Sequence, residues 1–309
     1  MSSPSPYRLF LLLSLVSLAL RWRTLVAAAE LALQNEAYTH ILLILPLSFA
    51  LIFLGWGPRK ADQEPNFLAG PILMLTAVLI GFAGDIWWPP NSAAVGARLT
   101  LGMLAVVIWW IGSFLCCFGT RVARRFVFPL CFLLWLVPLP QFALTHIVTF
   151  LQQGSADAAR LLFAVARVPV TQDGVSLSIP GLTLEVAQEC SSIRSSLMLA
   201  VATMVLAHLL LRSPWGKGLV ILAAIPLAIA KNGFRVFTLG VLGTYVNPSF
   251  LDGWLHHQGG VVFFLISLIG LFLLLRLIGW IESRLAAQPQ FPESLSSVSS
   301  AAADAPSRT

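Results

Sequence analysis

The 309 residues make a chain that is 58% hydrophobic and only 10% charged, whereas about 25% of the residues of an ordinary soluble domain are charged. This composition excludes a water-soluble enzyme and indicates an integral membrane protein. The formal net charge of +6 comes mostly from basic residues in short loops, so it indicates a charge bias between the two membrane faces and requires no nucleic-acid partner.

Apolar runs follow one another along most of the chain, and many reach the roughly 20 residues that a membrane-crossing helix needs. We therefore expect an all-α polytopic bundle of about eight transmembrane helices. Pro138 and Pro140 end the fifth run and turn the chain outward. The expected crossings are a first segment that begins at Leu9, then residues 37–58, 65–84, 99–120, 126–140, 195–211, 218–246 and 258–275.

The first segment has two interpretations. Arg8, the apolar run from Leu9 to Leu20 and the small residues 26–29 resemble a secretory signal with a cleavage site. Arg21 and Arg23 lie between that run and the small residues, and they favour a retained helix that continues past them.

Basic residues predict the orientation, because cytoplasmic loops are enriched in lysine and arginine. We expect a multi-pass protein of the cell inner membrane, with its longest loop on the extracytoplasmic face. Arg98, Arg160 and Arg167 fall on the outer side and count against the rule, although the last two lie in a long loop where a few charges have little weight. The expected cytoplasmic basic residues are Arg59, Lys60, Arg121, Arg124, Arg125, Arg212, Lys217, Arg276 and Arg284.

The longest loop predicts a small extracytoplasmic insertion. Residues 141–166 are partly amphipathic and predict an outer helix. Residues 169–187 alternate apolar and polar side chains around Pro180-Gly181, which predicts one or two short strands. We interpret residues 1–286 as a single transmembrane domain and residues 287–309, rich in Ser, Ala and Pro, as a disordered cytoplasmic tail.

The four cysteines divide between the two sides of the membrane. Cys116, Cys117 and Cys131 lie near the inner ends of the fourth and fifth crossings, where a cysteine most often packs as a small apolar residue. Cys190 lies outside, so it has no partner for an intramolecular disulfide and is either paired between chains or reactive. The chain contains no C-x-x-C sequence, which disfavours a thiol–disulfide relay.

Cys190 directly precedes an apolar run, and Ser191 and Ser192 are candidate N-caps. A thiol in the first turn of a helix feels the positive end of the helix dipole and unpaired backbone amides, which favour the thiolate. Arg194 lies four residues on and hence on the same helical face, while Glu189 opposes the effect if it points the same way. A packing cysteine at a helix start is the alternative.

Arg235 is the second unusual residue, because ionisable side chains inside a membrane are costly and usually line a polar cavity or site. It follows Lys217 by eighteen residues, or roughly 27 Å of helix, which places it near the outer boundary of the hydrocarbon. Lys231 is one turn deeper, with Asn232 beside it. A buried ion pair between helices, or an arginine that snorkels to the outer headgroups, is the alternative.

His256 and His257 lie at the outer start of the last crossing, and a histidine there can act as a base or an acid near neutral pH. A headgroup contact is the alternative. Cys190, Arg235 and His256 therefore share one membrane depth on successive helices. No spacing such as H-E-x-x-H supports a metal site. The other histidines are expected to be interfacial or core residues: His40, His146 and His208.

Three short blocks resemble the exosortase/archaeosortase family of membrane cysteine transpeptidases. Residues 186–195 (VAQECSSIRS) are similar to the cysteine motif of the family, residues 232–236 (NGFRV) to its Asn-x-x-Arg-Val/Ile block, and residues 256–260 (HHQGG) to its His-x-x-x-Gly segment. The final glycine of the last block favours His256 over His257 as the matching histidine.

The resemblance implies a protein-sorting reaction that uses no cofactor and no metal. Family members cut a C-terminal signal on exported proteins, which is a Pro-Glu-Pro motif followed by a transmembrane helix and a basic cluster, and transfer the new carboxyl end to a surface or lipid acceptor. The resemblance implies Cys190 as nucleophile, Arg235 as stabiliser of the thiolate or oxyanion, and His256 as acid and base. Ser192 stands where the family usually has glycine. A serine there narrows the space beside the thiol, so we expect it to alter substrate fit or rate without removing the nucleophile.

Without the family resemblance, the residues are also compatible with two other classes of protein. A polytopic transporter or scaffold without catalytic activity would account for the composition and the membrane charges, and would leave Cys190 replaceable. A thiol–quinone redox protein would use the outer cysteine but would need a second one nearby. Arg194 and Lys231 are supporting candidates for the catalytic site.

Overall fold

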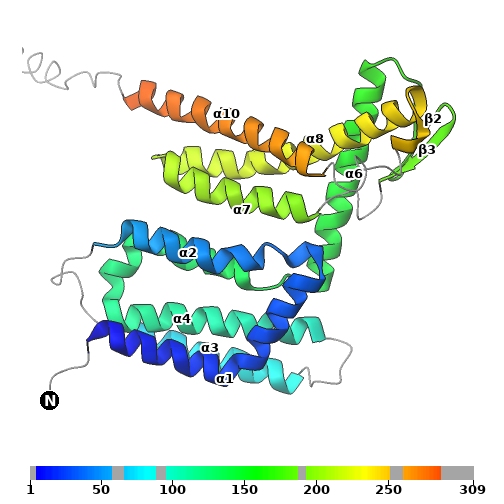
Figure 1. Ribbon diagram of the computed structural model, residues 1–309. Coiled ribbons are helices and arrows are strands. Elements are labelled where there is room, and N and C mark those ends of the chain that lie inside the picture. The colour runs from blue at the N-terminus through cyan, green and yellow to red at the C-terminus, as the bar shows by residue number, and fades with distance from the viewer. Residues whose placement is uncertain (1–4, 58–65, 88–94, 187–192, 251–259, 287–309) are drawn as a thin grey trace, which may run out of the picture.

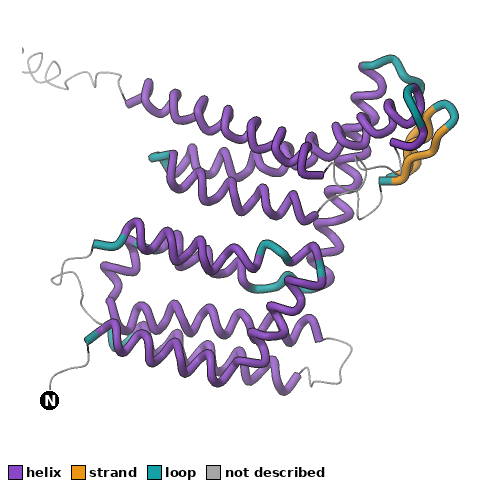
Figure 2. The backbone as a smooth tube through the Cα atoms, viewed as in Figure 1, coloured by secondary structure: helices purple, strands orange, loops and turns teal. Residues whose placement is uncertain are grey.

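The computed structural model describes residues 5–57, 66–87, 95–186, 193–250 and 260–286, and these residues are mostly helical (Figures 1 and 2). Seven described helices are long and apolar enough to cross a membrane, and a bent pair makes eight if it is taken as one span. The expected all-α polytopic bundle is therefore confirmed. The helices are α1 (Pro6–Gln34), η1 (Glu36–Tyr38), α2 (Ile41–Gly55), α3 (Ala69–Trp87), α4 (Val95–Arg125), α5 (Val127–Phe132), η3 (Leu133–Leu136), α6 (Gln141–Val165), α7 (Ile193–Leu210), α8 (Pro214–Tyr245), η4 (Pro248–Phe250) and α10 (Gly260–Ala286).

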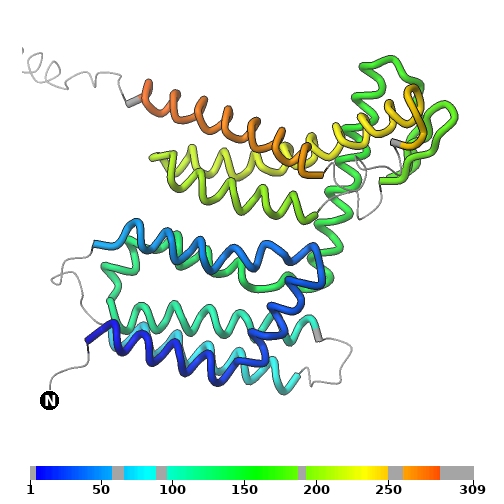
Figure 3. The backbone as a smooth tube through the Cα atoms, viewed as in Figure 1, coloured from blue at the N-terminus to red at the C-terminus, as the bar shows by residue number. Residues whose placement is uncertain are grey.

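The long helices form two groups. α1, α3 and α4 pack together in one group, and α7, α8 and α10 pack together in the other. α2 lies along α5 and η3 between the groups, and the chain passes back and forth between the same two ends of the bundle (Figure 3). α1 continues past Arg21 and Arg23 as expected, with a kink at Arg21, where φ is −117° and ψ is 21°.

The fifth crossing is short and sharply bent. Its helical part covers only Val127–Leu136, and the chain then becomes extended at Val137 and Pro140. The following helix α6 leaves at 96° to it. Proline disfavours a helical conformation in the residue before it and cannot donate a helical hydrogen bond, so Pro138 and Pro140 explain the bend. α6 therefore crosses one end of the bundle, where α7 begins (Figure 1).

The insertion contains three strands, and the prediction of one or two was too low. β1 (Thr171–Asp173), β2 (Ser176–Ile179) and β3 (Leu182–Glu185) form an antiparallel sheet in that order. The missed strand is β1, which carries the polar sequence Thr-Gln-Asp and so lacks an apolar alternation. The turn between β2 and β3 was found correctly, and Gly181 supplies its φ of 80°.

The sheet is fixed against two helices of the membrane domain. Leu177 of β2 is fully buried and packs in one cluster with Phe163 of α6 and Val236 of α8. Because these apolar contacts come from α6, α8 and the sheet together, the insertion also holds α6 against the part of α8 that contains Arg235.

The cysteine prediction is only partly right. Cys116 and Cys117 are buried, as expected for packing residues, but Cys131 is exposed on the surface of α5. An apolar helix in a bilayer can expose a cysteine toward lipid as readily as toward a neighbouring helix, and the sequence pattern does not separate the two faces. The tail at 287–309 lies outside the described residues.

Candidate active site

Arg235 lies in the C-terminal half of α8. α8 begins with Pro214 in its first turn, and the Ser213 side chain caps it by accepting a hydrogen bond from the Gly216 backbone amide. Arg235 is twenty-one residues beyond Pro214, or roughly 32 Å of helix, which is close to the roughly 30 Å thickness of the hydrocarbon.

Three neighbouring polar side chains in this part of α8 are buried, and together they form what we call the polar face of α8. Lys231 and Arg235 are each 7% exposed, and Asn232 is 1% exposed. Residues four apart lie on the same face of a helix, so the two cations point into the protein together. An arginine that snorkels to the outer headgroups would be exposed, and the burial of Arg235 rules out that alternative.

Lys231 joins this face to the first turn of α7. Its Nζ donates a hydrogen bond to Oγ of Ser195, the third residue of α7. Cys190 precedes the first residue of α7, Ile193, by three positions and lies outside the described residues. The described part of the helix that follows the cysteine is thus tied to the polar face of α8.

α6 supports α8 from another side through small residues. A Cβ atom at Gly233 would lie 2.6 Å from Cβ of Ala158 and 3.1 Å from the carbonyl oxygen of Ser155. Glycine therefore allows the backbones of α6 and α8 to approach closely between Asn232 and Arg235.

Gln152 of α6 holds the chain just before the cysteine segment. Its Nε2 donates a 3.0 Å hydrogen bond to the carbonyl oxygen of Val186, and the Val186 amide donates to the Val175 carbonyl at 3.0 Å. Val186 itself is fully buried. The chain before residue 187 is thus anchored to α6 and the sheet through Val186. The chain after residue 192 is anchored to α8 through Ser195.

α10 meets α8 next to Arg235. The rings of Phe234 and Phe263 contact edge to face, with 5.9 Å between their centroids, and the starts of α7 and α10 lie at the same end of the bundle (Figure 1). His256 and His257 precede α10 and lie outside the described residues. The described part of the site therefore consists of the polar face of α8 and the first turns of the two helices that follow Cys190 and His256.

Other candidate residues lie away from this face. Arg194 is 3.7 Å from Glu36 in a solvent-exposed ion pair, so it contacts η1 rather than Lys231. His40 is buried, with its Nδ1 3.2 Å from the Ala37 carbonyl oxygen, and His208 stacks on Phe128 with 4.0 Å between ring centroids. His40 is thus a core residue, as expected, and His208 is half-buried. Within the part of the chain that the structure describes, no group of three or more His, Cys, Asp or Glu side chains could hold a metal ion.

Sequence reasoning missed the residues that position the site. Gln152 carries no signal of its own, because isolated uncharged polar residues are common in apolar helices. Ser195 ends the block at 186–195, but the sequence does not show that it contacts Lys231. Gly233 lies inside the NGFRV block, but only the crossing of α6 over α8 shows why a glycine is required there.

A model of the transmembrane exosortase family matches residues 22–273. This match covers more than half of the chain. The protein belongs to the transmembrane exosortase family. It is accordingly a multi-pass membrane enzyme of protein sorting, of the membrane cysteine peptidase or transpeptidase type. The matched range of this exosortase includes positions 190, 235 and 256. Comparisons with curated proteins and with solved structures gave no match.

Proposed function

We propose that this exosortase cleaves a C-terminal sorting signal of the Pro-Glu-Pro type on exported proteins and transfers them to a surface or lipid acceptor. The observation that carries the proposal is the buried position of Arg235. Arg235 lies in the C-terminal half of α8, within one turn of the residues that contact the first turns of α7 and α10. Those two helices directly follow Cys190 and His256 in the sequence.

Cys190 is the nucleophile in this proposal. Arginine and lysine side chains near a thiol favour the thiolate, which is the reactive form. Lys231 and Arg235 project from one face of α8, and the tie from Lys231 to Ser195 keeps the start of α7 close to them. The site faces the extracytoplasmic side of the cell inner membrane.

The reaction has two halves that share one covalent intermediate. The Cys190 thiolate attacks the scissile carbonyl carbon, the C–N bond breaks, and the leaving amine takes a proton from His256. The substrate remains on the sulfur as a thioester. The acceptor then loses a proton to His256 and attacks the thioester carbonyl, and the sulfur leaves as thiolate. Arg235 donates hydrogen bonds to the oxyanion that forms in each half.

A polytopic transporter or scaffold is the competing function, and it needs no nucleophile. The two functions differ in what a cysteine substitution does to an exported reporter that ends in Pro-Glu-Pro, an apolar helix and arginines. We expect Cys190→Ala to abolish cleavage of this reporter while the variant accumulates normally in the membrane. Full cleavage by Cys190→Ala would refute the proposal.

The chain offers matched controls for this experiment. Cys131→Ala removes an exposed cysteine on α5 and is expected to leave cleavage unchanged. His256→Ala is expected to reduce cleavage at least 100-fold, in keeping with the size of general acid–base effects, whereas His257→Ala is expected to retain most of it. Equal losses in the two histidine variants would contradict the assigned role of His256.

A further inference from the structure

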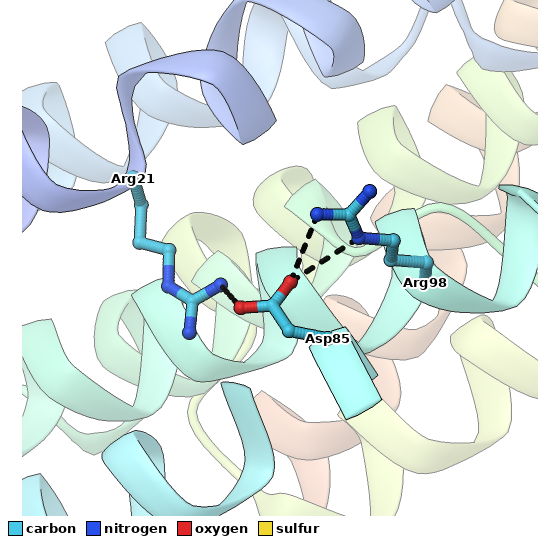
Figure 4. Close-up of polar contacts among 3 residues, drawn as sticks. All are labelled: Arg21, Asp85 and Arg98. Carbon is cyan, nitrogen blue, oxygen red and sulfur yellow. Dashed lines mark hydrogen bonds and ion pairs between the residues drawn. The ribbon is translucent and has the colours of Figure 1, made fainter. Parts of the chain in front are cut away.

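A second polar cluster lies in the other helix group, on α1, α3 and α4. Nη1 of Arg21 is 2.8 Å from Oδ2 of Asp85, and Nη2 of Arg98 is 3.2 Å from Oδ1 of the same carboxylate. Nε of Arg98 also donates to Oδ1 at 3.2 Å. Figure 4 shows the two guanidinium groups approaching Asp85 from opposite sides. The cluster carries one net positive charge, because two arginines share one carboxylate.

The backbone around the cluster is adapted to Arg21. The kink in α1 is at Arg21 itself, and a Cβ atom at Gly81 of α3 would collide with its guanidinium group. Each arginine has five N–H donors, and Asp85 accepts only part of this capacity. The side chains of Arg21 and Arg98 are 25% and 36% exposed, so further donors can reach a ligand.

A cavity of about 300 Å³ opens beside Arg21 and Asp85. These two residues form its charged side, and its other walls are mostly apolar, with Leu20 of α1, Val78 of α3 and Val106 of α4 among them. The cavity therefore combines a cationic edge with an apolar interior, which suits an amphiphile better than a free ion.

The cluster lies at the level where lipid headgroups begin. Trp22 adjoins Arg21 and Trp87 ends α3 two residues after Asp85, and these tryptophans are 56% and 71% exposed. Exposed tryptophans mark membrane–water interfaces. Leu20 and Val78, which line the cavity, are 71% and 50% exposed, so the cavity opens on a surface that faces lipid.

We propose that the Arg21–Asp85–Arg98 cluster binds the headgroup of an anionic phospholipid, with part of an acyl chain in the adjoining cavity. Arginine binds phosphate oxygens well because its planar guanidinium presents paired donors. The net charge of the cluster complements a headgroup with one negative charge. This site is separate from the polar face of α8, so the proposal does not depend on the reaction assigned to Cys190.

The competing interpretation is that the cluster only clamps α1, α3 and α4 together. The two interpretations differ for Asp85→Asn, which raises the net charge of the cluster by one while keeping the shape of the side chain. A lipid site predicts that this variant retains as much or more phosphatidylglycerol. A clamp predicts lower thermal stability with no preference for this lipid over phosphatidylcholine in any variant.

The experiment is native mass spectrometry of the purified full chain, reconstituted in equal amounts of phosphatidylglycerol and phosphatidylcholine, with thermal unfolding measured in parallel. We expect the wild type to retain phosphatidylglycerol at least tenfold over phosphatidylcholine. Arg98→Gln should lose this preference, because the cluster becomes neutral. Arg23→Gln, which removes an exposed arginine from the same helix as Arg21, should keep it.

Three results would overturn the proposal. The first is a wild type without a preference, and the second is an equal loss in Arg23→Gln and Arg98→Gln, which would indicate general charge attraction. The third is loss of phosphatidylglycerol from Asp85→Asn. Glycerol phosphate serves as the probe for free phosphate, and we expect it not to displace the lipid at millimolar concentration. Displacement would show that the headgroup alone binds and would contradict the role of the cavity.

Discussion

Substituting alanine for Gly233 tests whether the close crossing of α6 and α8 positions the catalytic residues. The new Cβ would lie 2.6 Å from Cβ of Ala158, whereas carbon atoms in contact lie about 3.5–4.0 Å apart. The two helices must therefore separate by about 1 Å at this point, which is the difference between those distances. Arg235 is two residues away on the same helix and must move with it.

The expected effect on stability is small and the effect on rate is large. Overpacking a core costs about 1–3 kcal/mol, and the better helix propensity of alanine offsets up to about 1 kcal/mol of this. A displacement of 1 Å in an active site lowers the rate on the order of 100-fold. We expect Gly233→Ala to insert normally, to unfold at a slightly lower temperature and to cleave the reporter about 100-fold more slowly.

The assay is the rate of reporter cleavage by purified enzyme in detergent, at equal amounts of folded protein. Gly218→Ala is the matched control, because it lies on the same helix and a Cβ there meets nothing within 4 Å. Wild-type cleavage by Gly233→Ala would refute the reasoning, and so would an equal loss in Gly218→Ala.

Two further predictions concern the residues that hold the site together. Lys231→Met removes the hydrogen bond to Ser195 and is expected to slow cleavage about tenfold or more, since hydrogen bonds to charged groups contribute about 1.5–3 kcal/mol. Ser195→Ala should slow cleavage by a similar factor. The double variant should cleave only slightly more slowly than either single variant. If the two losses of rate were additive, the two side chains would act separately. Gln152→Leu leaves the buried Val186 carbonyl unpaired and should reduce the free energy of unfolding by about 1–3 kcal/mol, which thermal denaturation of the purified protein measures; an unchanged transition would contradict this.

The membrane-crossing helices could be predicted from the sequence, because length and apolarity alone distinguish a membrane helix from other segments. The sequence also predicted the bend after the fifth run, since Pro138 and Pro140 restrict the backbone locally. It was insufficient for β1, whose polar residues pair through the backbone without an apolar pattern. It was also wrong about Cys131, because every residue of α5 is apolar and the pattern does not show which face packs.

For the site, the constant rise of a helix per residue gave the expected membrane depth of Arg235, and this depth stays a prediction. The burial of Arg235 could not be predicted, since burial depends on the crossing of α6 at Gly233 and on the tie from Lys231 to Ser195. Both contacts join segments that are far apart in the chain. The roles of Cys190 and His256 stay predictions from the sequence, because these residues lie outside the described part of the chain.

Interception of the acyl-enzyme by hydroxylamine would test the assignment of Cys190 most directly. Hydroxylamine attacks thioesters, so purified enzyme that cleaves the reporter in its presence should release a product whose new C-terminus is a hydroxamate. Mass spectrometry of the C-terminal peptide distinguishes this hydroxamate from a free carboxylate. We predict hydroxamate with the wild type and with Cys131→Ala, and no product with Cys190→Ala. Cleavage by the wild type that yields only free carboxylate at saturating hydroxylamine, or hydroxamate formed by Cys190→Ala, would contradict the account.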